Sequence, residues 1–312
     1  MANTTTSIGG VTLPGYVFNA SGPKDVTWDE LKVIAGSGAA AVVMKSCTLL
    51  PREGNEEPRY AFIKKPYGSI NSMGLPNLGY AEYVKFAAGL KKETKKPVIA
   101  SLAGLSPDDY PTLVKAFQES EVDIIEVNLS CPNVKGKPQI AYDFQKTDEI
   151  LASIMKLGKK PMGVKLPPYF DPIHTEQIVA VLKKYPLAFV CCINSVGNTL
   201  VIDGEKEQPV IKPKGGFGGL GGDFVKPVAL ANVRAMSQLL GDKMAVVGVG
   251  GIRTGMDAFE YLLCGADAVQ IGTAFYEEGE GCFARIESEL KAILDKKGYK
   301  SVADAKGKLK VL

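Results

Sequence analysis

A cysteine set among asparagines is the first place where this sequence offers chemistry. Residues 128–133 read Asn-Leu-Ser-Cys-Pro-Asn and follow an apolar run, so Asn128, Cys131 and Asn133 come together at one strand end. Asparagine amides combine donor and acceptor groups that suit an imide or amide ring, and a thiol whose thiolate is accessible can abstract a proton. A lone cysteine is more often a small buried hydrophobe. These residues alone therefore leave acid–base catalysis and simple packing equally open.

Two glycine turns late in the chain indicate a phosphate site. Gly250 and Gly251 follow one apolar run, and Gly272 and Thr273 follow the next. Glycines let a ligand approach the backbone closely, and backbone N–H groups at helix starts bind phosphate. Each pair by itself could merely form a tight turn, but the two together favour phosphate binding.

Two lysines stand at the ends of apolar runs. Lys45 lies in the triplet Met-Lys-Ser and Lys165 in the triplet Val-Lys-Leu. A lysine in an apolar strand must reach water, a partner or a ligand. A salt bridge at the rim of the fold is the simpler interpretation, whereas two such lysines on one face favour an anionic or electron-rich ligand. A flavin is such a ligand, because a cation beside its N1–O2 edge stabilises the reduced anion.

Other polar and glycine residues in the long connections are weaker signals. The amide, hydroxyl and neighbouring groups of interest are Asn71, Ser72, Met73, Gly74, Leu75, Asn194 and Ser195. Residues 215–222 form a glycine-rich loop, for which a flexible turn is the simpler interpretation. They lack the strand-then-helix setting of a dinucleotide fingerprint, and the chain has no GxxxxGKS/T motif, so we reject an NAD-type and a P-loop interpretation.

Eight apolar runs alternate with amphipathic stretches along nearly the whole chain. They cover residues 17–21, 40–46, 97–103, 123–130, 162–166, 188–195, 244–250 and 268–272. Consecutive apolar positions are typical of parallel strands that are buried on both faces. Eight β-then-α units predict an α/β fold, a single closed (β/α)8 barrel domain over residues 1–312. A doubly wound open sheet is the structural alternative.

Three connections are long for such a barrel, at residues 47–79, 131–142 and 196–224. All three follow strands, so we expect them on the C-terminal face, where the active sites of barrels lie. Residues 8–13 predict a small hairpin that closes the opposite end of the barrel.

The composition argues against several other classes of protein. The 312 residues include 37 Lys plus Arg and 34 Asp plus Glu, a formal charge of +3 without a basic cluster, so we expect no nucleic-acid partner. No stretch is apolar over the ~18–20 residues that span a bilayer, and the N-terminus does not resemble a signal peptide, so we expect no membrane partner. The six cysteines form no CxxC pair, which is typical of a reducing cytoplasm. The single histidine, His174, offers little for a metal centre or a Ser-His triad, and it is interpreted as a helix-start residue.

Five segments of the chain closely resemble class 1A dihydroorotate dehydrogenases. They are residues 52–60, 68–77, 128–133, 163–170 and 216–222, and the resemblance extends over nearly the whole chain. Membrane-bound class 2 relatives have serine at the position of Cys131. The resemblance implies FMN as the cofactor, no metal, and oxidation of dihydroorotate to orotate in UMP synthesis. It also implies fumarate as the electron acceptor, which becomes succinate, and a cytoplasmic homodimer.

The resemblance further implies roles for individual residues. Cys131 would take a proton from C5 of dihydroorotate while hydride passes from C6 to N5 of FMN. The orotate site would consist of Lys45, Asn71, Ser72, Met73, Gly74, Leu75, Asn128, Asn133, Asn194 and Ser195. The FMN site would consist of Ser21, Gly22, Lys45, Ser46, Asn128, Lys165, Ile193, Gly222, Gly250, Gly251, Gly272 and Thr273.

Three alternatives stay open at this point. A class 1B-like catalytic subunit, which passes electrons to an iron–sulfur and FAD partner, shares the cysteine loop, although the segments around Asn71 and at residues 215–222 favour class 1A. The second alternative is a phosphate-binding barrel lyase or isomerase without flavin. The third is a non-catalytic protein that binds a flavin or a nucleotide.

Overall fold

Eight parallel strands form the central sheet of the molecule. The computed structural model describes residues 1–64, 67–131 and 139–312. In spatial order the strands are β3 (Val17–Asn19), β16 (Ala268–Ile271), β15 (Ala245–Val249), β10 (Phe189–Cys192), β9 (Met162–Leu166), β8 (Ile124–Asn128), β7 (Val98–Leu102) and β4 (Val42–Val43). All eight predicted strands are present and the predicted barrel is confirmed. Several strands end earlier than expected, although single backbone hydrogen bonds continue beyond their ends, as from Ala20 N–H to Ile271 O at 2.9 Å and from Ile193 N–H to Val249 O at 3.0 Å.

The barrel closes between its first two strands largely through one side chain. Ala40 N–H donates to Val17 O at 2.9 Å near the start of β3 and β4. Further along, the buried amide of Asn19 donates to Val43 O at 2.8 Å and accepts from Val43 N–H at 2.9 Å. The amide of Asn19 therefore takes the place of a backbone peptide in the ladder.

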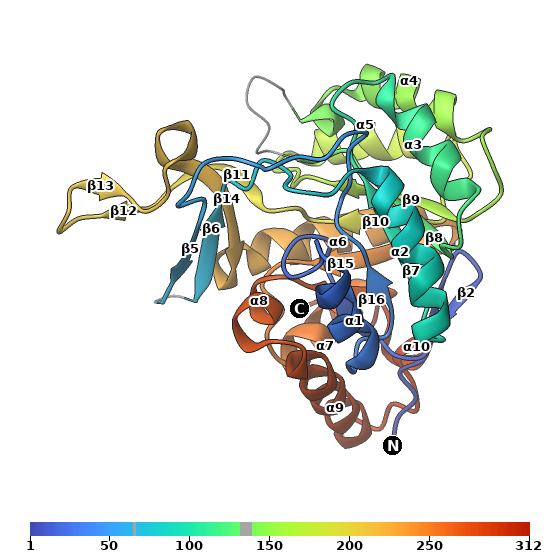
Figure 1. The fold of residues 1–312 in the computed structure, drawn as a ribbon. Coiled ribbons are helices and arrows are strands. Elements are labelled where there is room, and N and C mark those ends of the chain that lie inside the picture. The colour runs from blue at the N-terminus through green and yellow to red at the C-terminus, as the bar shows by residue number, and fades with distance from the viewer. Residues whose placement is uncertain (65–66, 132–138) are drawn as a thin grey trace.

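Helices surround the barrel and cover its outer face (Figure 1). They are α1 (Trp28–Gly36), α2 (Tyr80–Glu93), α3 (Asp109–Gln118), α4 (Phe144–Ile154), α5 (Pro172–Leu182), α6 (Lys226–Leu240), α7 (Gly255–Cys264), α8 (Thr273–Glu278), α9 (Gly281–Lys296) and α10 (Val302–Ala305). Short 3-10 turns lie at η1 (Ile140–Tyr142), η2 (Pro213–Gly216), η3 (Asp223–Val225) and η4 (Gly241–Lys243). Within the described part of the chain, no helix has the length and apolar character needed to cross a membrane.

Local sequence signals set where several helices begin. Thr27 and Glu30 form a reciprocal capping box at the start of α1. Asp171 caps α5, and Pro172 occupies its first turn, where a missing N–H is harmless. His174 follows in that first turn, so the helix-start interpretation of the single histidine is confirmed.

A hairpin of β1 (Thr6–Ile8) and β2 (Val11–Leu13) lies at the N-terminal end of the barrel. A Cβ at Gly9 would lie 2.6 Å from Pro161 Cβ and 2.8 Å from Ala188 Cβ, both just before barrel strands. The predicted hairpin and its position are therefore confirmed.

A second, antiparallel sheet stands beside the barrel (Figure 1). Its order is β11 (Val196–Leu200), β14 (Phe217–Gly222), β6 (Gly68–Asn71) and β5 (Tyr60–Ile63). The hairpin of β12 (Ile202–Asp203) and β13 (Gln208–Pro209) projects beyond it. Two of the long connections thus form a sheet with each other. The simpler interpretation of residues 215–222 as a flexible turn was wrong, because most of this glycine-rich segment is strand β14, paired on both sides.

Candidate active site

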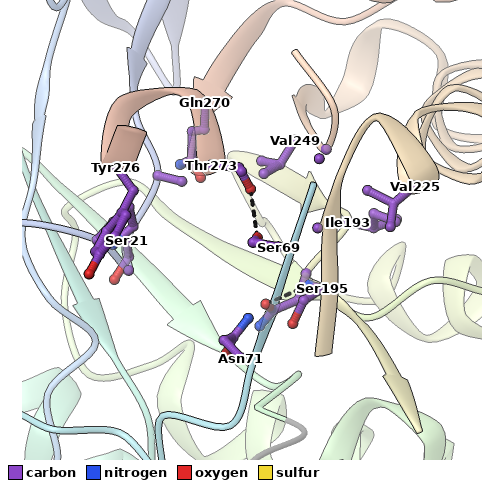
Figure 2. A pocket seen from close by; sticks show the side chains of 18 of the residues that line it. Ser21, Ser69, Asn71, Ile193, Ser195, Val225, Val249, Gln270, Thr273 and Tyr276 are labelled. Atoms are coloured by element: carbon purple, nitrogen blue, oxygen red, sulfur yellow. Dashed lines mark hydrogen bonds between the residues drawn. The ribbon is translucent and has the colours of Figure 1, made fainter. Parts of the chain in front are cut away.

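A cavity opens at the C-terminal ends of the barrel strands, with β6 and β14 as one of its walls. Figure 2 shows side chains from the barrel and from the small sheet pointing into the same space. The predicted residues that line it are Ser21, Gly22, Lys45, Ser46, Asn71, Met73, Gly74, Leu75, Asn128, Cys131, Lys165, Ile193, Asn194, Ser195, Gly222, Gly250, Gly251, Gly272 and Thr273. The structure therefore brings together residues spread over more than two hundred positions of the chain.

Two predicted site residues are not among those that line the cavity. Ser72 is fully buried; its N–H donates to Arg59 O at 2.8 Å, and its carbonyl accepts from Asn55 Nδ2 at 2.8 Å. It is a neighbour of Asn71, and alternation along an extended chain points its side chain away from the cavity. Asn133 lies outside the described residues.

The two glycine turns meet at one end of the cavity. Gly251 has a φ of +67°, and a Cβ there would lie 2.7 Å from Lys226 Cβ, so this turn requires glycine. Gly272 faces open space, since a Cβ there would meet its nearest neighbour, Ala20, only at 4.0 Å. Backbone N–H groups from two neighbouring strand ends thus border a space that a phosphate can enter.

Two side-chain contacts border the same end. The guanidinium of Arg253 lies 3.9 Å from the ring centroid of Tyr67. Ser69 on β6 and Thr273 are hydrogen-bonded through their hydroxyls at 3.1 Å, which joins the small sheet to the barrel (Figure 2). The sequence had not singled out Arg253, Tyr67 or Ser69 as site residues.

Both strand-end lysines are buried at the cavity. Lys165 lies on β9, and its ammonium donates to Gln270 Oε1 at 3.3 Å. Lys45 donates to the carbonyl of Gly22 and lies 3.7 Å from the carboxylate of Asp25. The simpler interpretation, a salt bridge at the rim, holds in part for Lys45, yet both lysines also line the cavity.

The residues around Cys131 are tied to one another by side-chain amides. Asn128 Oδ1 accepts from both the N–H and the hydroxyl of Ser130 at 3.0 Å. Asn194 Nδ2 donates to Ser130 O at 3.1 Å. Since these bonds join the ends of β8 and β10, they fix the backbone immediately before Cys131, whose thiol lines the cavity.

Lys214 is a charged neighbour of Cys131 that the sequence did not reveal. Burial lowers the pKa of Lys214 below its usual value, and the thiolate of Cys131 opposes this shift. Coulombic attraction is mutual, so the ammonium of Lys214 also favours the thiolate form of Cys131. Lys214 was missed because it comes more than eighty residues later, in a connection whose path depends on the second sheet.

Gln270 is the missed residue that sequence reasoning could have found. It lies within β16 and is 1% exposed, in an otherwise apolar run. Like Lys165, Gln270 is a polar side chain in a buried strand, and such a side chain must reach water, a partner or a ligand. Tyr60 and Tyr276, which also line the cavity with their rings 4.4 Å apart, offer no such signal.

Comparisons with known proteins agree with this architecture. Residues 3–294 match the family model described as dihydroorotate dehydrogenase. Proteins named dihydroorotate dehydrogenase A (fumarate) are 50% identical over 312 residues in Streptococcus pyogenes serotype M1, covering 99% of each chain, and 51% identical over 314 residues in Streptococcus uberis, covering 100% of each chain.

A solved structure shares the fold. The crystal structure of DHODH from Eimeria tenella in complex with ferulenol aligns with a TM-score of 0.84 and 22% identity, over 98% of this chain and 88% of that chain. The family match covers most of the chain, and the relatives named above match it from end to end. The resemblance predicted from the sequence motifs is thus confirmed, and the chain belongs to the dihydroorotate dehydrogenase family.

Proposed function

We propose that the residues of this cavity oxidise dihydroorotate to orotate, the redox step of UMP synthesis, with FMN as the bound cofactor and fumarate as the electron acceptor. The chain is a dihydroorotate dehydrogenase, an oxidoreductase that acts on a CH–CH bond. The observation on which the assignment of roles depends is the position of Cys131, which shares one cavity with two buried lysines and two glycine turns.

The residues present fit an FMN molecule. The open space before Gly272, bordered by the Gly250–Gly251 turn, suits the phosphate. Lys165, held by Gln270 on the barrel floor, suits the electron-rich edge of an isoalloxazine ring. When bound, FMN supplies the acceptor for the hydride that leaves C6 of dihydroorotate.

The chain's own residues would handle the proton and the orientation of the substrate. Cys131, as thiolate, takes the proton from C5, and the nearby ammonium of Lys214 favours that thiolate. Lys45 attracts the substrate carboxylate. The amides of Asn71, Asn128 and Asn194 offer donors and acceptors to the pyrimidine ring.

The test is to purify the protein and identify its cofactor. We expect about one FMN per chain, together with loss of its visible absorbance when dihydroorotate is added without oxygen. Dihydroorotate with its C5 hydrogens replaced by deuterium should slow this bleaching. FAD in place of FMN, or a flavin that dihydroorotate leaves oxidised, would contradict the proposal.

Three further properties belong to the same proposal. The whole chain, residues 1–312, would act as a single FMN-binding domain. It would work in the cytoplasm, as its cysteine usage predicts. It would form a homodimer, which light scattering at micromolar concentration can test; a mass near 33.3 kDa would contradict a dimer.

A further inference from the structure

A carboxylate with no part in the proposed mechanism is buried inside the barrel. Glu126 lies on β8 and is 0% exposed. Its two oxygens accept hydrogen bonds from Ser101 Oγ at 3.1 Å and from Gln270 Nε2 at 2.9 Å. Burying a carboxylate costs free energy of desolvation unless hydrogen-bond donors and nearby cations compensate its charge.

One arm of this arrangement leads from Glu126 to Lys165. An amide has donors on one side and an acceptor on the other. Because Glu126 can only accept, the NH2 group of Gln270 must face Glu126, which leaves Gln270 Oε1 to accept from Lys165 Nζ at 3.3 Å. Gln270 also lines the cavity, where Figure 2 shows it beside Thr273. Glu126 thus fixes the amide that holds the buried ammonium.

The other arm leads from Glu126 to hydroxyls at the cavity wall. Since Ser101 donates to Glu126, its oxygen accepts from the hydroxyl of Ser46 at 2.7 Å. The oxygen of Ser46 in turn lies 3.2 Å from the donating amide of Asn128 and 3.0 Å from Ser21 Oγ. Because Glu126 accepts at one end, it sets the donor and the acceptor of every hydrogen bond in this series.

We propose that Glu126 is a positioning residue, whose negative charge and hydrogen bonds orient Lys165 through Gln270 and Ser46 through Ser101, and so set the reduction potential of the bound flavin. This inference rests on the proposed function, because it presumes FMN in the cavity. Lys165 brings a positive charge that favours the reduced cofactor. Glu126 lies behind it and partly cancels this field, so its charge keeps the potential lower than Lys165 alone would make it.

The test compares the potential of the bound flavin in the wild-type protein and in Glu126→Gln. The substitution keeps the size of the side chain and lets Ser101 reverse its hydrogen bond, so the packing survives while the charge is lost. We expect the reduction equilibrium to shift toward the reduced form by at least about tenfold, equal to about 30 mV for a two-electron couple. Titration against a redox dye measures this shift directly and does not depend on turnover.

A second variant tests the same inference with the opposite sign. Ser101→Ala removes one donor from Glu126 and leaves its charge less compensated, so the potential should fall. Glu126→Asp retains the negative charge, so the flavin in this variant should keep most of the wild-type potential. Both variants keep the inference testable if Glu126→Gln does not fold.

Glu287 provides the matched control. It is also a buried carboxylate, but it accepts from the N–H groups of Tyr16 and Val17, at the N-terminal end of β3 and away from the cavity. Glu287→Gln should leave the potential unchanged. If flavin-loaded Glu126→Gln and Ser101→Ala both keep the wild-type potential, the inference is overturned while the proposed function stands. A wild-type protein without FMN would instead overturn the proposed function and this inference with it.

Discussion

The carboxylate of Asp25 lies 3.7 Å from the ammonium of Lys45, and both side chains are buried. Burial raises the pKa of Asp25 to about 6, although Lys45 and the N–H of Gly22 both act to lower it. Among the described residues, Asp25 Oδ1 has no hydrogen-bond partner, whereas Oδ2 accepts from Gly22 N–H at 2.7 Å. Asp25 therefore changes its charge within the range of pH in which enzymes are assayed.

This titration predicts a pH dependence of orotate binding. Because the pKa of Asp25 is raised, its carboxyl group becomes neutral as the pH falls through about 6. Lys45 then loses its compensating charge, and the cavity becomes more positive. An anion such as orotate should bind more tightly at pH 5 than at pH 7.5, by a factor on the order of ten. Titration of the flavin absorbance with orotate gives the dissociation constant at each pH.

Asp25→Asn is the control for this assignment. The variant is neutral at every pH, so its orotate affinity should be nearly flat between pH 5 and 7.5 and close to the wild-type value at low pH. Persistence of the full pH dependence in Asp25→Asn would show that another group is responsible.

Removing the thiol of Cys131 should slow the reductive half-reaction and leave the cofactor bound. Positioned acid–base catalysis contributes ~10²–10⁴-fold, and Cys131→Ala should lose a factor in this range. Cys131→Ser should keep part of the activity and gain more of it as the pH rises, because an alkoxide forms less readily than a thiolate. Stopped-flow mixing with dihydroorotate measures the rate of flavin reduction. Cys264→Ala, which changes a cysteine of α7 outside the cavity, should react at the wild-type rate, and a loss below about threefold in Cys131→Ala would contradict the assigned role.

The barrel residues of the site were predictable because eight repeated β-then-α units imply a closed barrel, which determines where its strand ends lie. Lys165, Gly250 and Gly272 each end a buried apolar run, and the ends of parallel strands meet on one face of a barrel. Their proximity thus follows from topology alone. Gln270, which was overlooked, lies on such a strand as well.

The residues contributed by the second sheet were less accessible to sequence reasoning. Strand β14 consists largely of glycine, which has low intrinsic preference for a strand, and it forms because β6 and β11 pair with it. Its partner β6 is separated from it in sequence by about half the chain. No local pattern indicates such pairing, so neither the stack of Tyr67 on Arg253 nor the burial of Ser72 away from the cavity could be foreseen.

Replacing Asn19 should destabilise the barrel more than an ordinary polar substitution does. Asn19→Leu leaves the N–H and the C=O of Val43 buried without their partners. Each unsatisfied backbone group costs about 1–3 kcal/mol, so we expect a loss of about 2–6 kcal/mol in the free energy of unfolding. Urea denaturation, or the thermal midpoint at a fixed scan rate, measures the effect. Asn3→Leu removes a single hydrogen bond at an exposed position and should change stability little; equal effects of the two substitutions would contradict this role of Asn19.

Fumarate is the electron acceptor that we expect, as the names of the relatives suggest. Fumarate carries a carboxylate beside an unsaturated carbon, as orotate does, and Lys45 with the amides of Asn71 and Asn128 could hold it in the position that orotate vacates. The two electrons would come from the reduced cofactor, and Cys131, protonated by the first half-reaction, could return its proton to give succinate.

One site that serves both half-reactions in turn has definite kinetic consequences. Initial rates should follow a ping-pong pattern, and orotate should compete with fumarate for the reduced enzyme. Mixing the dihydroorotate-reduced protein with fumarate in a stopped-flow instrument should restore the oxidised absorbance. Cys131→Ala should slow this reoxidation as well, because it lacks the proton donor, whereas a quinone, which needs no proton from Cys131, should reoxidise wild type and variant alike. If the flavin stays reduced with fumarate but is rapidly reoxidised by a quinone or by a partner flavoprotein, fumarate is not the acceptor, while the oxidation of dihydroorotate would be unaffected.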